Sequence, residues 1–173
     1  MRALAVLPTV GIAWLTACGG PAAGRPASDV VATAAAGCRE GEAEKCEVAC
    51  ANGSADACNE AGRAYEMGIG VTKSGVAANT FYRKACDLGD SAGCYNAAYL
   101  LENGIAGRRD VGCALALYRV ACDAGHTRSC MSAGFIYKAG LDVPKDKARA
   151  AESFRKACDG GYSAGCQQLQ SVD

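Results

Sequence analysis

The sequence predicts an all-α fold, a solenoid of antiparallel helical hairpins built from 36-residue repeats and stapled by disulfides. Twelve of the 173 residues are cysteine, far more than in an average protein. Two cysteine series share one period, the second always eight positions after the first: Cys50, Cys86, Cys122 and Cys158, then Cys58, Cys94, Cys130 and Cys166. Glycine and apolar columns keep the same register, which indicates a structural unit rather than a chance pattern.

Each repeat is predicted to hold two helices, called helix A and helix B. Apolar residues with helical spacing place helix A at residues 54–67, 91–103 and 127–139. Gly68, Gly104 and Gly140 are expected to end it, since glycine adopts the left-handed conformation at little cost. Helix B is expected at residues 76–86, 112–122 and 147–158. A glycine-centred turn then leads into the next helix A.

The eight-residue spacing predicts local disulfides. One cysteine ends helix B and the other lies in the first turns of the next helix A, so the turn between them brings the two Cα atoms close together. The N-terminal pair has the same spacing outside the 36-residue phase, as expected of a truncated cap. We expect these pairs: Cys38–Cys46, Cys50–Cys58, Cys86–Cys94, Cys122–Cys130 and Cys158–Cys166. Evenly spaced pairs do not suit a zinc site, and we expect no metal or other cofactor.

Residues 1–17 are predicted to be a lipoprotein signal peptide, because a basic start and a short apolar run lead to Leu15-Thr16-Ala17-Cys18. This segment resembles the lipobox of bacterial lipoproteins, which implies that Cys18 becomes a lipid-modified N-terminus. The alternative is an ordinary signal peptide with an accidental cysteine. Residues 18–37 are expected to be a flexible tether, and residues 38–173 the solenoid. Gly19 is not an acidic retention residue, so the resemblance implies an outer-membrane lipoprotein that faces the periplasm.

The charge balance disfavours a polyanionic partner. The 18 basic and 18 acidic residues cancel, and no cationic cluster is longer than Arg108-Arg109. Nucleic-acid binding therefore has little electrostatic support. We expect a protein or a cell-wall ligand as the partner, and contact with the membrane only through the lipid anchor.

The third unit, from Cys122 to Cys158 with its stretch GLDVPKDKARAAESFRKAC, resembles the Sel1-like repeat family, relatives of the tetratricopeptide repeats. The paired cysteines make residues 38–173 similar to the cysteine-rich bacterial branch typified by the Helicobacter cysteine-rich proteins. The resemblance implies a right-handed superhelix that serves as a protein-interaction surface. Some relatives are described as penicillin-binding or weakly β-lactamase-like, which implies a hydrolase as the alternative function.

Two fragments fit serine β-lactam motifs, but the repeat argues against both. Ser153 and Lys156 have the Ser-x-x-Lys spacing, and Lys73-Ser74-Gly75 fits the Lys-Thr/Ser-Gly motif. Phe81 and Leu117 occupy the column of Ser153, which makes this serine one substitution in a structural helix. The single histidine, His126, lies in a column of turn residues and is expected to be solvated. We therefore predict no catalytic residues.

The helix A face opposite the packed columns is the predicted partner surface. Its columns vary from unit to unit and include aromatic residues and methionine, which suit a partner's apolar anchor. The candidate residues are Asn59, Arg63, Glu66, Tyr95, Tyr99, Glu102, Met131, Phe135 and Lys138. The alternative is that Tyr99 and Phe135 only pack against the neighbouring helix.

Cys113 is left over once ten cysteines are paired and Cys18 is assigned to lipid. We predict a free thiol there, half-buried and inert on helix B. The alternative is an intermolecular disulfide or a redox-reactive site.

Overall fold

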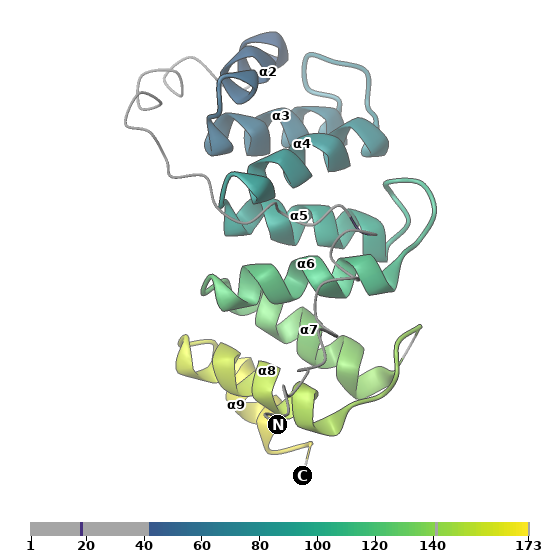
Figure 1. Ribbon diagram of the computed structural model, residues 1–173, viewed down its shortest axis with the longest axis vertical. Helices are drawn as coiled ribbons and strands as arrows, with labels where there is room; N and C mark the ends of the chain where they lie inside the picture. Colours follow the sequence, from purple (N-terminus) through teal and green to yellow (C-terminus); the bar gives the residue numbers. More distant parts are fainter. Residues whose placement is uncertain (1–17, 19–41, 141, 173) are drawn as a thin grey trace, which may run out of the picture.

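The computed structural model describes residues 18, 42–140 and 142–172, and within them every regular element is helical. The helices follow one another along a single stack, from α2 at one end to α9 at the other (Figure 1). This arrangement of consecutive hairpins confirms the predicted all-α solenoid. Its helices are α2 (Ala43–Ala51), α3 (Ala55–Met67), α4 (Gly75–Asp87), α5 (Ser91–Glu102), α6 (Val111–Asp123), α7 (Thr127–Ala139), α8 (Lys147–Asp159) and α9 (Ser163–Leu169).

The boundaries of α3 to α8 lie within one residue of the predicted ones, because local signals fix them. Short polar side chains cap the N-termini: Ser54 Oγ accepts a hydrogen bond from the backbone N–H of Ala57, and Asp110 Oδ1 accepts one from that of Cys113. Gly68 and Gly140 end α3 and α7 in the left-handed conformation, with φ of 76° and 69°. Helices α3, α5 and α7 are therefore helix A of the three units, and α4, α6 and α8 are helix B.

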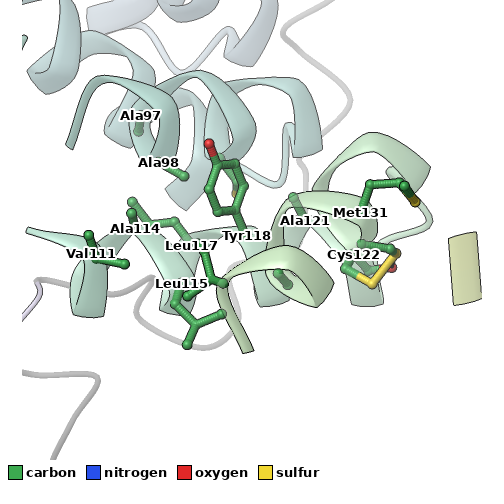
Figure 2. Packing of buried hydrophobic residues seen from close by; sticks show 14 of the residues in the cluster. Ala97, Ala98, Val111, Ala114, Leu115, Leu117, Tyr118, Ala121, Cys122 and Met131 are labelled. Carbon is green, nitrogen blue, oxygen red and sulfur yellow. Dashed lines mark hydrogen bonds between the residues drawn. A yellow bond between two sulfur atoms is a disulfide. The ribbon is translucent and has the colours of Figure 1, made fainter. Parts of the chain in front are cut away.

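An aromatic ring from helix B forms the centre of each unit. Tyr82, Tyr118 and Phe154 recur every 36 residues and are at most 2% exposed. In Figure 2 the ring of Tyr118 extends from α6 toward Ala98 on α5. The same column holds Gly134 in the third unit, where an added Cβ would lie 2.5 Å from Phe154 Cε1. Small residues on helix A thus let helix B pack closely against it.

Much of the remaining core is alanine and cysteine. The alanine column of helix B, Ala85, Ala121 and Ala157, is completely buried. Alanine contributes little apolar area, so the disulfides supplement a modest hydrophobic core. None of the described helices is both long and apolar enough to span a membrane.

Candidate functional site

Two aromatic residues of the predicted partner surface are exposed. Tyr99 on α5 and Phe135 on α7 occupy the same column, and they are 44% and 45% exposed. The Phe135 ring packs edge-on against the buried Phe154 ring, with the centroids 5.3 Å apart. This contact holds Phe135 in place while it leaves much of the ring open to solvent. Exposed aromatic rings with little freedom to lose are well suited to binding a protein.

Glu66 and Glu102, also candidates for this surface, are bound by their own units. Glu66 Oε2 accepts a hydrogen bond from Tyr82 Oη at 2.6 Å, and Glu102 Oε2 accepts one from Tyr118 Oη at 2.8 Å. Burial is the largest cause that raises the pKa of Tyr118, followed by this hydrogen bond. The two glutamates therefore tie helix A to helix B within each of the first two units.

The third unit changes both members of this pair together. Lys138 takes the place of the glutamate, and Phe154, which has no hydroxyl, takes the place of the tyrosine. The ammonium of Lys138 donates instead to Gln168 Oε1 at 3.0 Å and to Ser171 Oγ at 2.8 Å. Lys138 thus holds the C-terminal segment against α7.

Three further candidates for the partner surface are buried or already bound to other side chains, and are therefore less free to contact a partner than the sequence indicated. Met131 is 6% exposed because it belongs to the hydrophobic core drawn in Figure 2, so its predicted exposure is wrong. The amide of Asn59 accepts a hydrogen bond from Asn96 Nδ2 at 3.0 Å. Arg63 forms an ion pair with Glu60 at 2.8 Å.

Tyr95 lies in a cluster around the start of α7. Its ring centroid is 4.9 Å from that of His126, and the Arg128 guanidinium lies 5.9 Å from it. His126 is the N-cap of α7, and its Nδ1 accepts from the backbone N–H of Ser129 at 3.3 Å. Burial and the Arg128 charge lower the pKa of His126, against the opposing charge of Asp90. His126 is thus a half-buried helix cap, and the solvated histidine expected from the sequence is only partly exposed.

Four disulfides join successive helices, with Cα–Cα separations of 4.5 to 4.8 Å: one joins α2 to α3, and the other three join a helix B to the helix that follows it. They have the eight-residue spacing expected from the sequence: Cys50–Cys58, Cys86–Cys94, Cys122–Cys130 and Cys158–Cys166. Cys46 is disulfide-bonded as well. Its predicted partner, Cys38, lies outside the described residues, and that pair stays a prediction.

Cys113 is bonded to Cys18, so the predicted free thiol is wrong in this structure. The two Cα atoms are 5.4 Å apart, although 95 residues separate them in the sequence. Cys113 lies in the first turn of α6 and is half-buried, which leaves its sulfur within reach of a second cysteine. Lipidation of Cys18 would use the same sulfur atom, so the lipid and this disulfide exclude each other. The predicted signal peptide and the predicted tether, apart from Cys18, lie outside the described residues and stay predictions.

The serine and lysine that resemble a β-lactam motif are committed to other contacts. Ser153 Oγ donates to the backbone carbonyl of Arg149 at 2.8 Å. Lys156 Nζ lies 2.8 Å from Asp123 and 3.2 Å from Glu152, and these hydrogen bonds raise the pKa of Lys156. A lysine held in the protonated form cannot accept the proton of the serine. Ser74, the other serine considered, caps the N-terminus of α4.

Sequence reasoning missed a polar pocket of about 220 Å³ between α6, α7 and α8. Its lining includes Arg119, Asp123, Tyr137, Arg149, Ser153 and Lys156. The sequence carried a signal for it, because Ser153 is the one small residue in a column otherwise held by Phe81 and Leu117. Among the described residues, no group of His, Cys, Asp or Glu could hold a metal ion.

Comparison with known proteins identifies the repeat. The Sel1 repeat family model matches residues 55–90, 91–126 and 127–162, more than half of the protein. No curated protein sequence matches it significantly.

The solved structures that are similar include the following three. A protective antigen of uropathogenic Escherichia coli strains with an SLR fold is 22% identical (TM-score 0.67), and a Sel1 repeat protein from Oxalobacter formigenes is 29% identical (TM-score 0.65). Helicobacter pylori cysteine-rich protein B is 25% identical, with a TM-score of 0.57. The similarity covers 75%, 73% and 73% of this protein, and 28%, 51% and 90% of the respective relatives. The protein therefore spans about half or less of the first two.

Proposed function

Because the protein belongs to the Sel1 repeat family, we propose that it is an exported scaffold that binds a partner protein through Tyr99 and Phe135. The observation that carries the proposal is the exposure of these two rings at equivalent positions on successive A helices. Aromatic residues are enriched among those that contribute most to protein interfaces. The stack of hairpins is also covalently stapled, so little conformational entropy is lost when a partner binds.

Export is supported by the disulfides, since such bonds persist in oxidising compartments and are rare in the cytosol. The similarity to the Helicobacter cysteine-rich protein supports it too. Attachment to the outer membrane through a lipid on Cys18 is the finer part of the proposal. The segment Leu15-Thr16-Ala17-Cys18 supports it, and the anchored form must lack the Cys18–Cys113 disulfide. A cell-wall ligand in place of the protein partner is the other outcome that the experiment below distinguishes.

The test is photo-crosslinking in the bacterial cell envelope, with a crosslinking amino acid at the exposed position of Asn103, next to the end of α5. We expect a protein adduct that the double variant Tyr99→Ala/Phe135→Ala loses. Leu88, which is 43% exposed in the turn after α4, provides the matched control, and Leu88→Ala should keep the adduct. An adduct that survives the double variant, or adducts to cell-wall fragments alone, would contradict the proposal.

A further inference from the structure

The polar pocket exists because one bulky column is interrupted in the third unit. In the first unit Phe81 lies in this column and stacks on Tyr65, with the ring centroids 5.4 Å apart and the planes at 11°. In the second unit Leu117 fills it and is 3% exposed. Ser153 is too short to cover Tyr137, the counterpart of Tyr65, in the same way. The space that opens beside Tyr137 is the pocket of about 220 Å³.

The first unit shows which chemical group belongs beside this tyrosine. There the hydroxyl of Tyr65 donates to Glu47 Oε1 on α2 at 2.7 Å. Two repeats on, Arg119 takes the place of Glu47, and Tyr137 takes the place of Tyr65. Arg119 cannot accept a hydrogen bond. The Tyr137 hydroxyl therefore has no carboxylate, and it makes no hydrogen bond with any residue that the structure describes.

The charges that line the pocket leave one cation without a partner among the described residues. Asp123 and Glu152 both contact Lys156, which accounts for the two carboxylates of the lining. Arg149 is paired with Asp146, and its guanidinium lies 5.7 Å from the centre of the Tyr137 ring. Arg119 forms no ion pair within residues 42–140 and 142–172. The lining of the pocket thus includes a guanidinium without an ion pair and, on the buried Tyr137, a phenolic hydroxyl without a hydrogen bond, both judged against the residues that the structure describes.

We propose that this pocket binds a carboxylate of a protein partner, which accepts hydrogen bonds from the Arg119 guanidinium and the Tyr137 hydroxyl. The bound carboxylate would replace, from outside, the one that Glu47 supplies in the first unit. The site is separate from the exposed rings: Phe135 and Tyr137 are two positions apart on α7, which turns them about 200° around the helix. The carboxylate comes either from an acidic residue or from the C-terminus of the partner, and the proposal can fail or hold independently of the Tyr99 surface.

The test is an NMR titration of the ¹⁵N-labelled, oxidised protein with three small probes. Nα-acetylglutamate α-methylamide offers only the carboxylate of an acidic residue, N-acetylglycine offers only a C-terminal one, and the glutamine analogue offers neither. We expect saturable shifts at the amides of residues 119, 137 and 153 with at least one acid, and none with the glutamine analogue. The acid that binds more tightly identifies the source. No saturable shift at these amides with either acid would overturn the proposal.

The variants separate a specific site from general attraction to positive charge. Arg119→Ala should weaken binding about tenfold, as expected for a lost charge-assisted hydrogen bond. Arg155→Ala is the matched control, because Arg155 occupies the same column one repeat on, is exposed and does not line the pocket. Ser153→Phe should abolish binding by filling the space as Phe81 does in the first unit. Equal weakening in both arginine variants would refute the site, and this comparison stands even if Ser153→Phe fails to fold.

Discussion

Removal of the Tyr118 hydroxyl tests whether the Tyr–Glu pairs hold each hairpin together. Tyr118 is 1% exposed as a residue, and its Oη donates to Glu102 at 2.8 Å. A hydrogen bond to a charged group contributes about 1.5–3 kcal/mol when both partners are buried. Glu102 is partly exposed, which reduces the expected loss for Tyr118→Phe to about 1 kcal/mol.

A double-mutant cycle with Glu102→Ala isolates the pair, since Tyr118 also interacts with Ser132. Urea unfolding of the four proteins should give a coupling free energy of about 0.5–1.5 kcal/mol. The third unit supplies the control. Phe154→Tyr places a hydroxyl opposite Lys138, which stands where the other two units have a glutamate, so the variant should not stabilise the fold. A coupling energy near zero, or a gain from Phe154→Tyr, would refute this account. If the account holds, Glu102→Ala should lower stability and leave the affinity of the folded protein for its partner unchanged.

Three further predictions concern the disulfides between helices, the stability of the protein above pH 10 and the modification of Cys18. Replacing Cys86 and Cys94 by alanine should lower the free energy of unfolding, measured in urea, by roughly 2.5 kcal/mol. Removing the last disulfide, Cys158–Cys166, should release only α9 from the stack. An equal loss of unfolding free energy in the two variants would contradict this prediction. The pKa of Tyr118 is raised above the ordinary 10.0, so the Tyr118 hydroxyl stabilises the fold fully below pH 10 and loses this contribution at higher pH. The urea midpoint should therefore fall above pH 10, and Tyr118→Phe should make this fall smaller. Intact mass spectrometry should find one of two forms: Cys18 carries the lipid and is not bonded to Cys113, or the Cys18–Cys113 disulfide is present and the lipid is absent. A lipidated protein that retains this disulfide would contradict the prediction, because both modifications need the Cys18 sulfur.

The helices were predictable because the information that defines them is local. Cap residues, left-handed glycines and apolar spacing all act within one or two turns, and the repeat presents each signal three times. The eight-residue disulfides share this property. The Cys18–Cys113 disulfide does not, because it joins α6 to a residue outside the repeat, 95 positions away. No periodic pattern records such a contact.

The candidate site was harder to predict, because an amphipathic pattern does not distinguish an exposed polar residue from one engaged within the fold. Glu66 and Glu102 lie on the face opposite the packed columns, as the pattern indicates, yet each accepts a hydrogen bond from a buried tyrosine. Only the change of both columns together in the third unit, to Lys138 and Phe154, records that contact in the sequence.

Comparison of equivalent positions in the three units therefore distinguishes substitutions that the fold explains from substitutions that indicate a function. At Lys138 and Phe154 the hydroxyl and its acceptor disappear together, so no polar group is left unpaired and the change is explained by the fold. At Ser153 no larger side chain nearby fills the space that Phe81 and Leu117 occupy in the other units, and a pocket remains. Arg119 likewise removes the acceptor that Glu47 provides, while Tyr137 keeps its hydroxyl. A departure without compensation weakens packing and hydrogen bonding in the isolated protein, and a ligand that fills the space would recover both.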